Sequence, residues 1–410
     1  MSRRLLLAVA IALGAPIAVR AALGPAYGGE AIVAVPALAD SLDPARPADA
    51  AERLVLGLVH DTLIGIGADG RPRPGLARTW SGLAGDREWV LELDSDARFH
   101  DDADVTAEDA LRSLRRYLDA RSPAAVELSA RLSPEGLSVS DSRHVVLRFR
   151  EPQPEAPLLL AAAAAAITSP SGAGAGPFLP TFRVPGQRLA LTAFADHVRG
   201  RPYLDRVTLT VVADEARRAA DVAAGRVDAA LEAGPFGTGA AFATLMLVLD
   251  RTRPPLDTPA ARATIAEAIR AANIPAFLPG STALQVLPSA VGAAPPRGPL
   301  ALTVSADVPA LASQRLAAVL ESLGVRVSVE PRSPDAAREA ETPLRLLLEV
   351  PEVPVGMVVV AERRALSGGI EGGAVPIASL PLRLATASRL HGAHIGPDGA
   401  ARFEDAWVDP

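Results

Sequence analysis

The chain has 410 residues, of which 49% are hydrophobic and 21% are charged, and its formal net charge is −6 at pH 7. This length and apolar content can furnish two or three folded domains of about 150 residues each. The 41 basic residues are all arginine and are dispersed along the chain, so nucleic acid is not an expected partner. Cysteine is absent, which excludes disulfide bonds, thiol catalysis and cysteine-ligated metals.

The first residues have the pattern of a secretory signal. Arg3 and Arg4 precede an apolar run over residues 5–19, and small residues suited to cleavage follow. We predict a signal peptide over residues 1–26 and a periplasmic location. The apolar run is shorter than the roughly 20 residues that span a bilayer, and Pro16 interrupts it, so a membrane anchor is the second choice.

The next elements alternate between strand and helix signals. Residues 31–35 form an apolar run of strand length, and residues 52–66 have helical spacing and precede a turn at Asp69-Gly70. Apolar alternation over residues 89–93 predicts a strand. A helix is then predicted after Thr106, whose Thr-x-x-Asp arrangement with Asp109 is a capping signal, with apolar positions at 107, 110, 111, 114 and 118.

The middle of the chain adds three predictions. Residues 137–149 have the alternation of a hairpin, and the alanine-rich segment 154–167 favours a buried or half-buried helix because alanine has the highest helix propensity. The glycine-rich run 172–178 lacks the Lys and Ser/Thr of a phosphate-binding loop, so nucleotide binding is not expected. Further on, strand, helix and strand patterns at 300–304, 310–323 and 325–329 predict a parallel β-α-β unit.

A specific motif runs through the second quarter of the chain. An Asp-Gly turn is followed by Pro-Gly-Leu-Ala-x-x-Trp, then by Phe-His-Asp, Thr-Ala-Glu-Asp and Ser-Leu-x-Arg. These residues are Asp69, Gly70, Pro74, Gly75, Leu76, Ala77, Trp80, Phe99, His100, Asp101, Thr106, Ala107, Glu108, Asp109, Ser113, Leu114 and Arg116. The pattern resembles the most recognisable block of the family 5 extracellular solute-binding proteins, the dipeptide and oligopeptide receptors of ABC importers.

Other blocks extend the resemblance in the family's order. They lie at residues 41–44, 186–191, 200–207, 224–228 and 254–269. One departure is His197-Val198, which stands where relatives usually carry an aromatic pair. We interpret it as a change in a surface feature of the fold.

The resemblance implies an α/β, bilobed fold like that of periplasmic binding proteins, of type II and similar to cluster C, with a small subdomain inserted in lobe I. Lobe I is expected over residues 27–244, with the subdomain at about 70–170. Lobe II is expected over 245–372, in reduced form, and residues 373–410 would return to lobe I. A final strand at 376–384 would cross between the lobes.

The same resemblance implies candidate ligand-binding residues, which are Ser41, His60, Phe178, Asp250, Arg251 and Arg253. Ser41 belongs to a signature at the mouth of the cleft, and His60 replaces a frequent aromatic residue that can face the ligand. Asp250 stands where relatives usually place Asn and could meet a cationic ligand. A core-edge histidine and an exposed turn carboxylate are the plainer interpretations of His60 and Asp250.

The resemblance is poorest after residue 344. Between a strand at 344–350 and the final strand, relatives carry several dozen more residues, including an acidic segment that receives the N-terminal amine of a peptide. Only about 25 residues remain here. The peptide clamp of the family therefore cannot be transferred, and we expect weak or no binding of di- and tripeptides.

The predicted function is that of a monomeric periplasmic receptor that captures a small solute, peptide-like or other, and delivers it to ABC permease subunits. A family member that has lost transport and acts through its surfaces is the alternative, and a metal chelate or haem is an alternative ligand. No Gly-x-Ser-x-Gly motif is present, so no enzyme activity and no cofactor are expected. The acidic residues at 101, 102 and 104 lack the later Gly and Glu of a calcium loop, and Gly392 and Gly396 place the pair His391 and His394 in a loop rather than on one helix face, so a metal site is not expected.

Overall fold

The computed structural model describes residues 24–38, 41–45, 50–119, 123–233, 242–278, 280–284, 298–349, 373–396 and 399–409. Most of the predicted signal peptide and the shortened stretch before the final strand lie outside these ranges. Within the described ranges, no helix is both long and apolar enough to cross a membrane.

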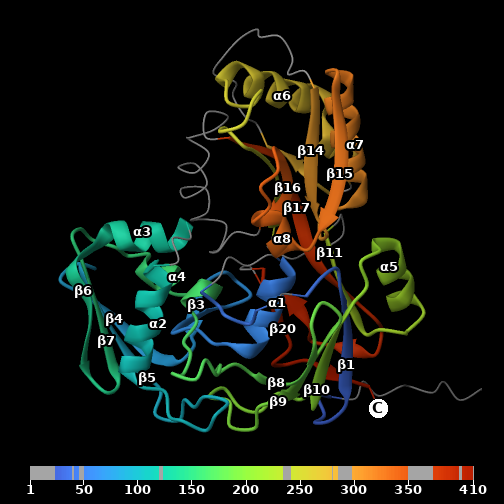
Figure 1. Ribbon diagram of the computed structural model, residues 1–410. Coiled ribbons are helices and arrows are strands. Elements are labelled where there is room, and N and C mark those ends of the chain that lie inside the picture. The colour runs from blue at the N-terminus through green and yellow to red at the C-terminus, as the bar shows by residue number, and fades with distance from the viewer. Residues whose placement is uncertain are drawn as a thin grey trace, which may run out of the picture.

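One large sheet runs through both lobes (Figure 1). Its strands, in spatial order, are β15 (Val325–Arg332), β14 (Gly298–Ser305), β16 (Leu344–Glu349), β12 (Phe242–Leu249), β17 (Ala374–Thr386), β11 (Ala229–Ala233), β1 (Glu30–Val35), β10 (Arg206–Val211), β9 (Arg188–Ala193) and β8 (Phe178–Val184), and the short β13 (Thr282–Ala283) also pairs with β17. The bilobed α/β fold predicted from the sequence is confirmed.

Strand β17 joins the two lobes. Residues 374–381 lie antiparallel to β12 in lobe II, and residues 382–386 lie antiparallel to β11 in lobe I. Pro381 is the last residue opposite β12, and Leu382 is the first opposite β11. The predicted crossing strand is therefore present and extends beyond its expected bounds of 376–384.

Lobe II contains the predicted parallel unit. Strands β14 and β15 pair in parallel and are connected by α7 (Ala310–Ser322), which ends before Gly324 at a φ of 81°. Glycine suits this left-handed position because it has no Cβ. The lobe also holds α6 (Pro259–Ala272), the 3-10 turn η2 (Ile274–Phe277) and the short helix α8 (Pro334–Arg338).

In lobe I, the helix predicted over residues 52–66 is too long. Helix α1 spans Ala50–Val59, and residues 64–66 instead form β2 (Ile64–Ile66), which pairs with β3 (Pro72–Pro74). The carbonyl groups of residues 62 and 63 accept hydrogen bonds from the amides of residues 76 and 77. This long-range pairing overrides the helical spacing because Ile64 and Ile66 are both buried at strand period.

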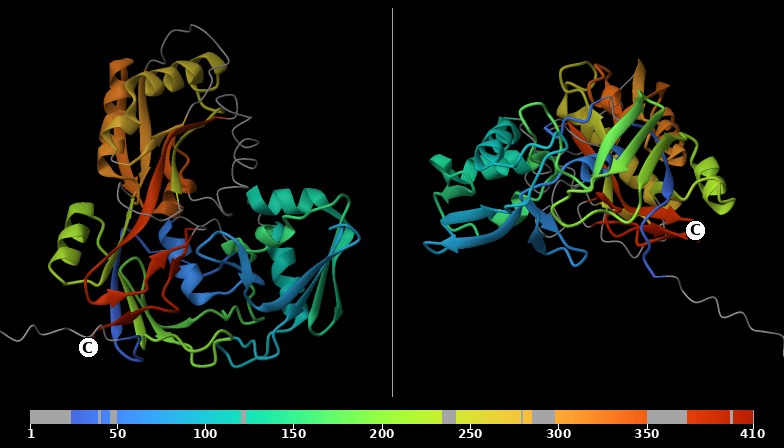
Figure 2. Two further views of the ribbon diagram at one scale, coloured as in Figure 1. Left: turned by 180° about the vertical axis from the view of Figure 1, so that it is seen from behind. Right: turned by 90° about the horizontal axis from the view of Figure 1, so that it is seen from below.

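The remaining elements of lobe I flank its sheet (Figure 2). Helix α5 (Glu215–Ala223) is capped by Asp214, whose side chain accepts a hydrogen bond from the Arg217 amide. The C-terminal segment forms two small hairpins. One pairs β18 (Leu390–His391) with β21 (Trp407–Val408), and the other pairs β19 (His394–Ile395) with β20 (Ala401–Arg402).

The inserted subdomain has its own core. An antiparallel sheet in the order β4 (Ala77–Leu83), β5 (Glu88–Leu93), β7 (His144–Phe149) and β6 (Leu132–Asp141) packs beside α2 (Ala107–Asp119) and α3 (Pro123–Arg131). Fully buried side chains of this core include Phe99, Leu91, Leu93, Leu114 and Tyr117. The predicted strand, hairpin and capped helix of this region are confirmed.

The alanine-rich segment 154–167 is buried as expected but is not one helix. It forms α4 (Ala156–Leu159) and the 3-10 turn η1 (Ala163–Ala165), separated by the extended residue Ala162. The Ile167 amide donates to the carbonyl of Asp61 at 2.9 Å, which ties the end of the segment to lobe I. Such tertiary contacts outweigh helix propensities, which differ by less than about 1 kcal/mol per residue for most residue types.

Candidate functional site

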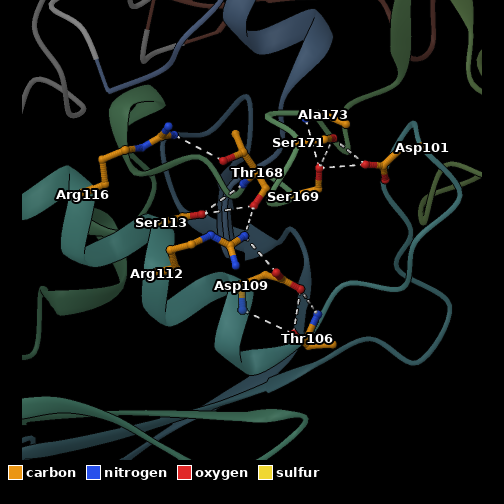
Figure 3. Close-up of polar contacts among 10 residues, drawn as sticks. All are labelled: Asp101, Thr106, Asp109, Arg112, Ser113, Arg116, Thr168, Ser169, Ser171 and Ala173. Atoms are coloured by element: carbon orange, nitrogen blue, oxygen red, sulfur yellow. Dashed lines mark hydrogen bonds and ion pairs between the residues drawn. The ribbon is translucent and has the colours of Figure 1, made fainter.

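Helix α2 presents different side chains on three faces. Ala107, Ala110, Leu114 and Tyr117 point into the subdomain core and are fully buried. A second face carries Asp109, Arg112, Ser113 and Arg116, of which the last three contact Thr168 and Asp109 pairs with Arg112 (Figure 3). The third face is formed by residues 108, 111, 115 and 118. The second face leads, through Arg116, to the loop at residues 41–45, which the sequence places at the mouth of the ligand cleft.

The start of α2 holds the second face in place. The Thr106 amide donates to Asp109 Oδ2 at 3.1 Å, and the Asp109 amide donates to Thr106 Oγ1 at 3.3 Å. These two bonds form a reciprocal cap at the helix N-terminus. Asp109 Oδ1 forms an ion pair with Arg112 Nη2 at 2.8 Å, so the capping residue also orients the arginine.

Three side chains of α2 converge on Thr168. Ser113 Oγ accepts from the Thr168 amide at 3.1 Å, and Arg112 Nη2 donates to the Thr168 carbonyl at 2.7 Å. Arg116 Nη2 donates to Thr168 Oγ1 at 3.3 Å (Figure 3). The backbone before Ser169 is thereby fixed against helix α2, because the amide and the carbonyl of Thr168 both have hydrogen-bond partners.

Arg116 also reaches the loop at residues 41–45, which carries the predicted cleft signature. Arg116 Nη1 lies 3.3 Å from Asp43 Oδ1, and Ser41 Oγ accepts a hydrogen bond from the Asp43 amide at 3.1 Å. His60 Nε2 lies 2.8 Å from the Leu42 carbonyl oxygen. The structure thus brings Ser41 and His60, two of the predicted site residues, to one loop that is held from both lobe I and the subdomain.

His60 is a buried neutral histidine. Burial lowers its pKa to about 4, against which the hydrogen bond to the Leu42 carbonyl acts only partly. The neutral ring donates from Nε2 to that carbonyl, and Nδ1 has no hydrogen-bond partner in the described part of the chain. The position of His60 at the core edge is the plainer of the two interpretations considered for it.

Gly174 and Gly176 pack directly against the backbone beside His60. A Cβ at Gly174 would lie 2.0 Å from the Val59 carbonyl oxygen, and one at Gly176 would lie 2.6 Å from the His60 amide nitrogen. These two glycines therefore allow close backbone approach. Phe178, which follows them, is fully buried in the main core, so its side chain offers no exposed surface to a ligand.

Asp250 and Arg253 form a local turn at the end of β12 in lobe II. Asp250 Oδ1 accepts from the Thr252 amide and hydroxyl, and Arg253 Nε pairs with Asp250 Oδ2 at 2.9 Å. The bonds from Thr252 lower the pKa of Asp250 below its usual range. Arg251 is exposed beside them. This group lies in a different lobe from Ser41 and His60, and no hydrogen bond or ion pair joins the two sets among the described residues.

A buried ionic cluster was missed by the sequence interpretation. Asp61 Oδ2 lies 2.9 Å from His197 Nε2, and Arg199 Nη2 donates to Asp61 Oδ1 at 3.1 Å. His197 is 4% exposed, so the prediction that this position is a surface feature is wrong. Burial raises the pKa of Asp61, but Arg199 and His197 together outweigh burial and hold this pKa well below its usual range, so the carboxylate stays ionised.

An ion pair between the lobes was also missed. Arg338 of α8 in lobe II lies 3.6 Å from Glu52 of α1 in lobe I, measured from Nη1 to Oε2, and its Nε lies 3.5 Å from Glu349 Oε1. The side chains of Arg338 and Glu52 are only 15% and 8% exposed. Residues 286 positions apart cannot be paired from spacing alone, so no sequence signal identified this contact.

Metal binding finds no support in the described ranges, where no group of three or more potential ligands is close enough together. Asp101 is engaged by the hydroxyls of Ser169 and Ser171 at 2.8 and 2.7 Å (Figure 3). His391 stacks on Trp407 with ring centroids 4.2 Å apart.

One sheet passes through both lobes, and a polar loop at residues 41–45 is held between lobe I and the inserted subdomain, so the chain is a two-lobed α/β protein. Residues 71–274, about half of the chain, match the profile of the bacterial extracellular solute-binding proteins, family 5. The resemblance predicted from the sequence is confirmed, and the chain belongs to this family. No curated protein matches the sequence.

Solved structures share the fold at low sequence identity. The chain is similar to the periplasmic binding protein DppA of Helicobacter pylori in complex with the peptide STSA, with a TM-score of 0.76, 14% identity, and coverage of 94% of this chain and 99% of that one. The murein tripeptide binding protein MppA of Escherichia coli is similar with a TM-score of 0.74 and 15% identity, and the match covers 92% of this chain and 98% of MppA. The binding protein AgaA of A. tumefaciens R10 in complex with agropinic acid has a TM-score of 0.74 and 16% identity, and the match covers 93% of this chain and 99% of AgaA.

Proposed function

We propose that this protein is the periplasmic receptor of an ABC importer, which captures a small solute between its two lobes and presents it to membrane permease subunits. The observation that carries the proposal is the bilobed fold with a sheet continuous through both lobes, in a chain that belongs to family 5. Closure of two lobes on a ligand is the usual working motion of such folds. The family match favours this function over a surface-acting protein or a haem receptor.

Three contacts order polar groups on lobe I near its contact with lobe II. Glu52 and Arg338 face each other there from opposite lobes. The loop at residues 41–45 is fixed by Arg116 and by His60. A preformed wall of this kind lowers the entropy cost of binding because its polar groups are already ordered. Among the predicted site residues, we propose Ser41 as the one best placed to meet a ligand.

The ligand is proposed to be a small polar solute other than an ordinary short peptide. Similar structures hold the peptide STSA in one case and agropinic acid in another, so the fold accommodates both kinds of ligand. The shortened sequence before the final strand lacks the acidic segment that binds a peptide amine in relatives. This absence favours a non-peptide solute.

Native mass spectrometry of the protein purified from its own periplasm tests the proposal. We expect a retained small molecule, which would identify the solute class directly. A solute at 100 times its dissociation constant should stabilise the fold by about 2.7 kcal/mol, enough for a thermal-shift panel. Only the mass of the bare chain, together with no stabilisation by any solute in the panel, would contradict the proposed function. Stabilisation by several unrelated di- and tripeptides would overturn the ligand class alone.

A further inference from the structure

The third face of α2 forms a stripe at the edge of the subdomain core, where Leu118 packs against the core and the other members lie toward the surface. Its members are Glu108, Leu111, Arg115 and Leu118, which follow one another at intervals of three or four residues and so lie along one side of the helix. Glu108 and Arg115 are exposed, and the two leucines are half-buried. On the remaining faces, the helix is committed to the core and to the Thr168 segment.

This stripe borders a groove between α2 and strand β6. A hollow of about 600 Å³ is lined by Leu111, Arg115 and Leu118 from the helix and by β6 residues that include Leu137 and Val139. A second hollow of about 410 Å³ is lined by Glu108 and by residues 139–142. Both hollows border Val139, so together they follow the helix from its first turn to its last.

The strand on the other side of the groove is the edge of its sheet. In the described part of the subdomain, β6 pairs with β7 and with no further strand. The pairing is regular over Leu137–Val139 and shifts register before Leu137. An unpaired edge presents backbone N–H and C=O groups that an extended polypeptide can bind as an added strand.

The charges of the groove are segregated by position. Arg115 and Arg150 line the larger hollow, and no ion pair involves either of them within the described ranges. Glu108 lines the smaller hollow and likewise has no ion pair there. Glu135 is the one acidic residue among the residues that line the larger hollow, so its described lining carries a formal charge of +1.

We infer that this groove docks an extended segment of a partner protein, with apolar side chains toward the leucine stripe, an acidic residue beside Arg115 and Arg150, and a basic residue near Glu108. The unpaired strand edge favours a polypeptide over a lipid, because an acyl chain cannot satisfy backbone donors and acceptors. The surface belongs to the inserted subdomain and is separate from the proposed solute site, so it would serve an interaction beyond solute capture.

A labelled synthetic peptide of about eight residues tests the inference by fluorescence anisotropy on the full chain. The peptide alternates valine and threonine, with one lysine at one end and two glutamates at the other, and both chain directions are used. Charge reversal at Arg115→Glu combined with Arg150→Glu is expected to weaken binding of the better peptide by about tenfold or more. Arg143→Glu is the matched control, because Arg143 is exposed in the same subdomain and does not line the groove.

Two further arms decide the outcome. A peptide with lysines in place of the glutamates should bind the wild-type chain more weakly and should regain affinity on the Arg115→Glu, Arg150→Glu variant. Hydrogen exchange should show protection of the β6 amides around Leu137–Val139 when the acidic peptide binds. Absence of binding by both acidic peptides, equal effects of the groove and control variants, or displacement of the peptide by oleate would each overturn the inference. Solute retention in the cleft is measured independently, so these results leave the proposed function untouched.

Discussion

His60 sets a pH dependence at the scale of one residue. Its pKa is about 4 in the folded protein because of burial, whereas an unfolded chain has a histidine pKa of about 6.5. As the pH falls below 6.5, the unfolded chain takes up a proton at His60 before the folded protein does. The contribution of His60 to the free energy of unfolding is therefore fully present above pH 6.5 and is lost as the pH falls toward 4. The loss reaches roughly 3 kcal/mol.

The variant His60→Gln separates this effect from all other titrations. We expect the free energy of unfolding, measured by urea denaturation, to fall less between pH 7 and pH 4.5 in the variant than in the wild type. Every other group titrates in both proteins, so the difference between the two curves reports His60. Parallel curves would show that His60 is not buried in its neutral form.

Asp61 holds together a charged cluster within lobe I. The variant Asp61→Asn leaves the buried His197 and the partly exposed Arg199 without the carboxylate that they share, and we expect a loss of about 3 kcal/mol in unfolding free energy. Asp196→Asn is a suitable control because Asp196 is exposed next to His197. Equal unfolding midpoints for the two variants would argue against the cluster.

At the scale of an element, the cap of α2 links helix stability to the polar wall that the helix carries. Thr106→Ala removes the hydroxyl that accepts from the Asp109 amide, and we expect a cost of about 1 kcal/mol in urea unfolding. Thr106→Ser retains the hydroxyl and should restore most of that loss. If serine and alanine were equally destabilising, the methyl group rather than the cap would be responsible.

Elements that are determined by residues close in the sequence could be predicted, whereas elements that depend on contacts with residues far away in the sequence could not. The Thr106 cap and the apolar spacing that follows it lie within one stretch, and α2 formed as expected. Alanine propensity misled over residues 154–167 because the Ile167 amide is bonded to Asp61, far away in the sequence.

The candidate site likewise combines motifs that the sequence reveals with long-range contacts that it does not. The motif that contains Ser41 and the one that contains Arg116 were both recognised, but their meeting through Asp43 depends on how the subdomain packs against lobe I. His197 was placed at the surface because nothing near it in the sequence reveals its partner Asp61, which lies 136 positions earlier. Burial of a polar residue is therefore the least predictable property here.

At the scale of the whole molecule, the ion pair between Arg338 and Glu52 should bias the lobes toward each other. Arg338→Gln removes the charge at the lobe interface, and we expect an increased radius of gyration in small-angle X-ray scattering of the ligand-free protein. High salt should affect this pair weakly because both side chains are largely buried.

Arg332→Gln provides the matched control for that experiment. Arg332 pairs with Glu330 on the exposed strand β15 and makes no described contact with lobe I. An unchanged radius in both variants would show that the lobes are held by other contacts, and a similar increase in both would indicate a general loss of compactness.

The path of β17 has a mechanical consequence. Proline has no backbone N–H and so cannot donate to the ladder of a sheet. Pro381 occupies the point where β17 leaves β12 and meets β11, so the ladder has a built-in gap between the lobes. A change in strand twist can be absorbed there without breaking an existing donor bond. A rotation of the lobes about Pro381 would therefore leave the register of each half of the strand unchanged.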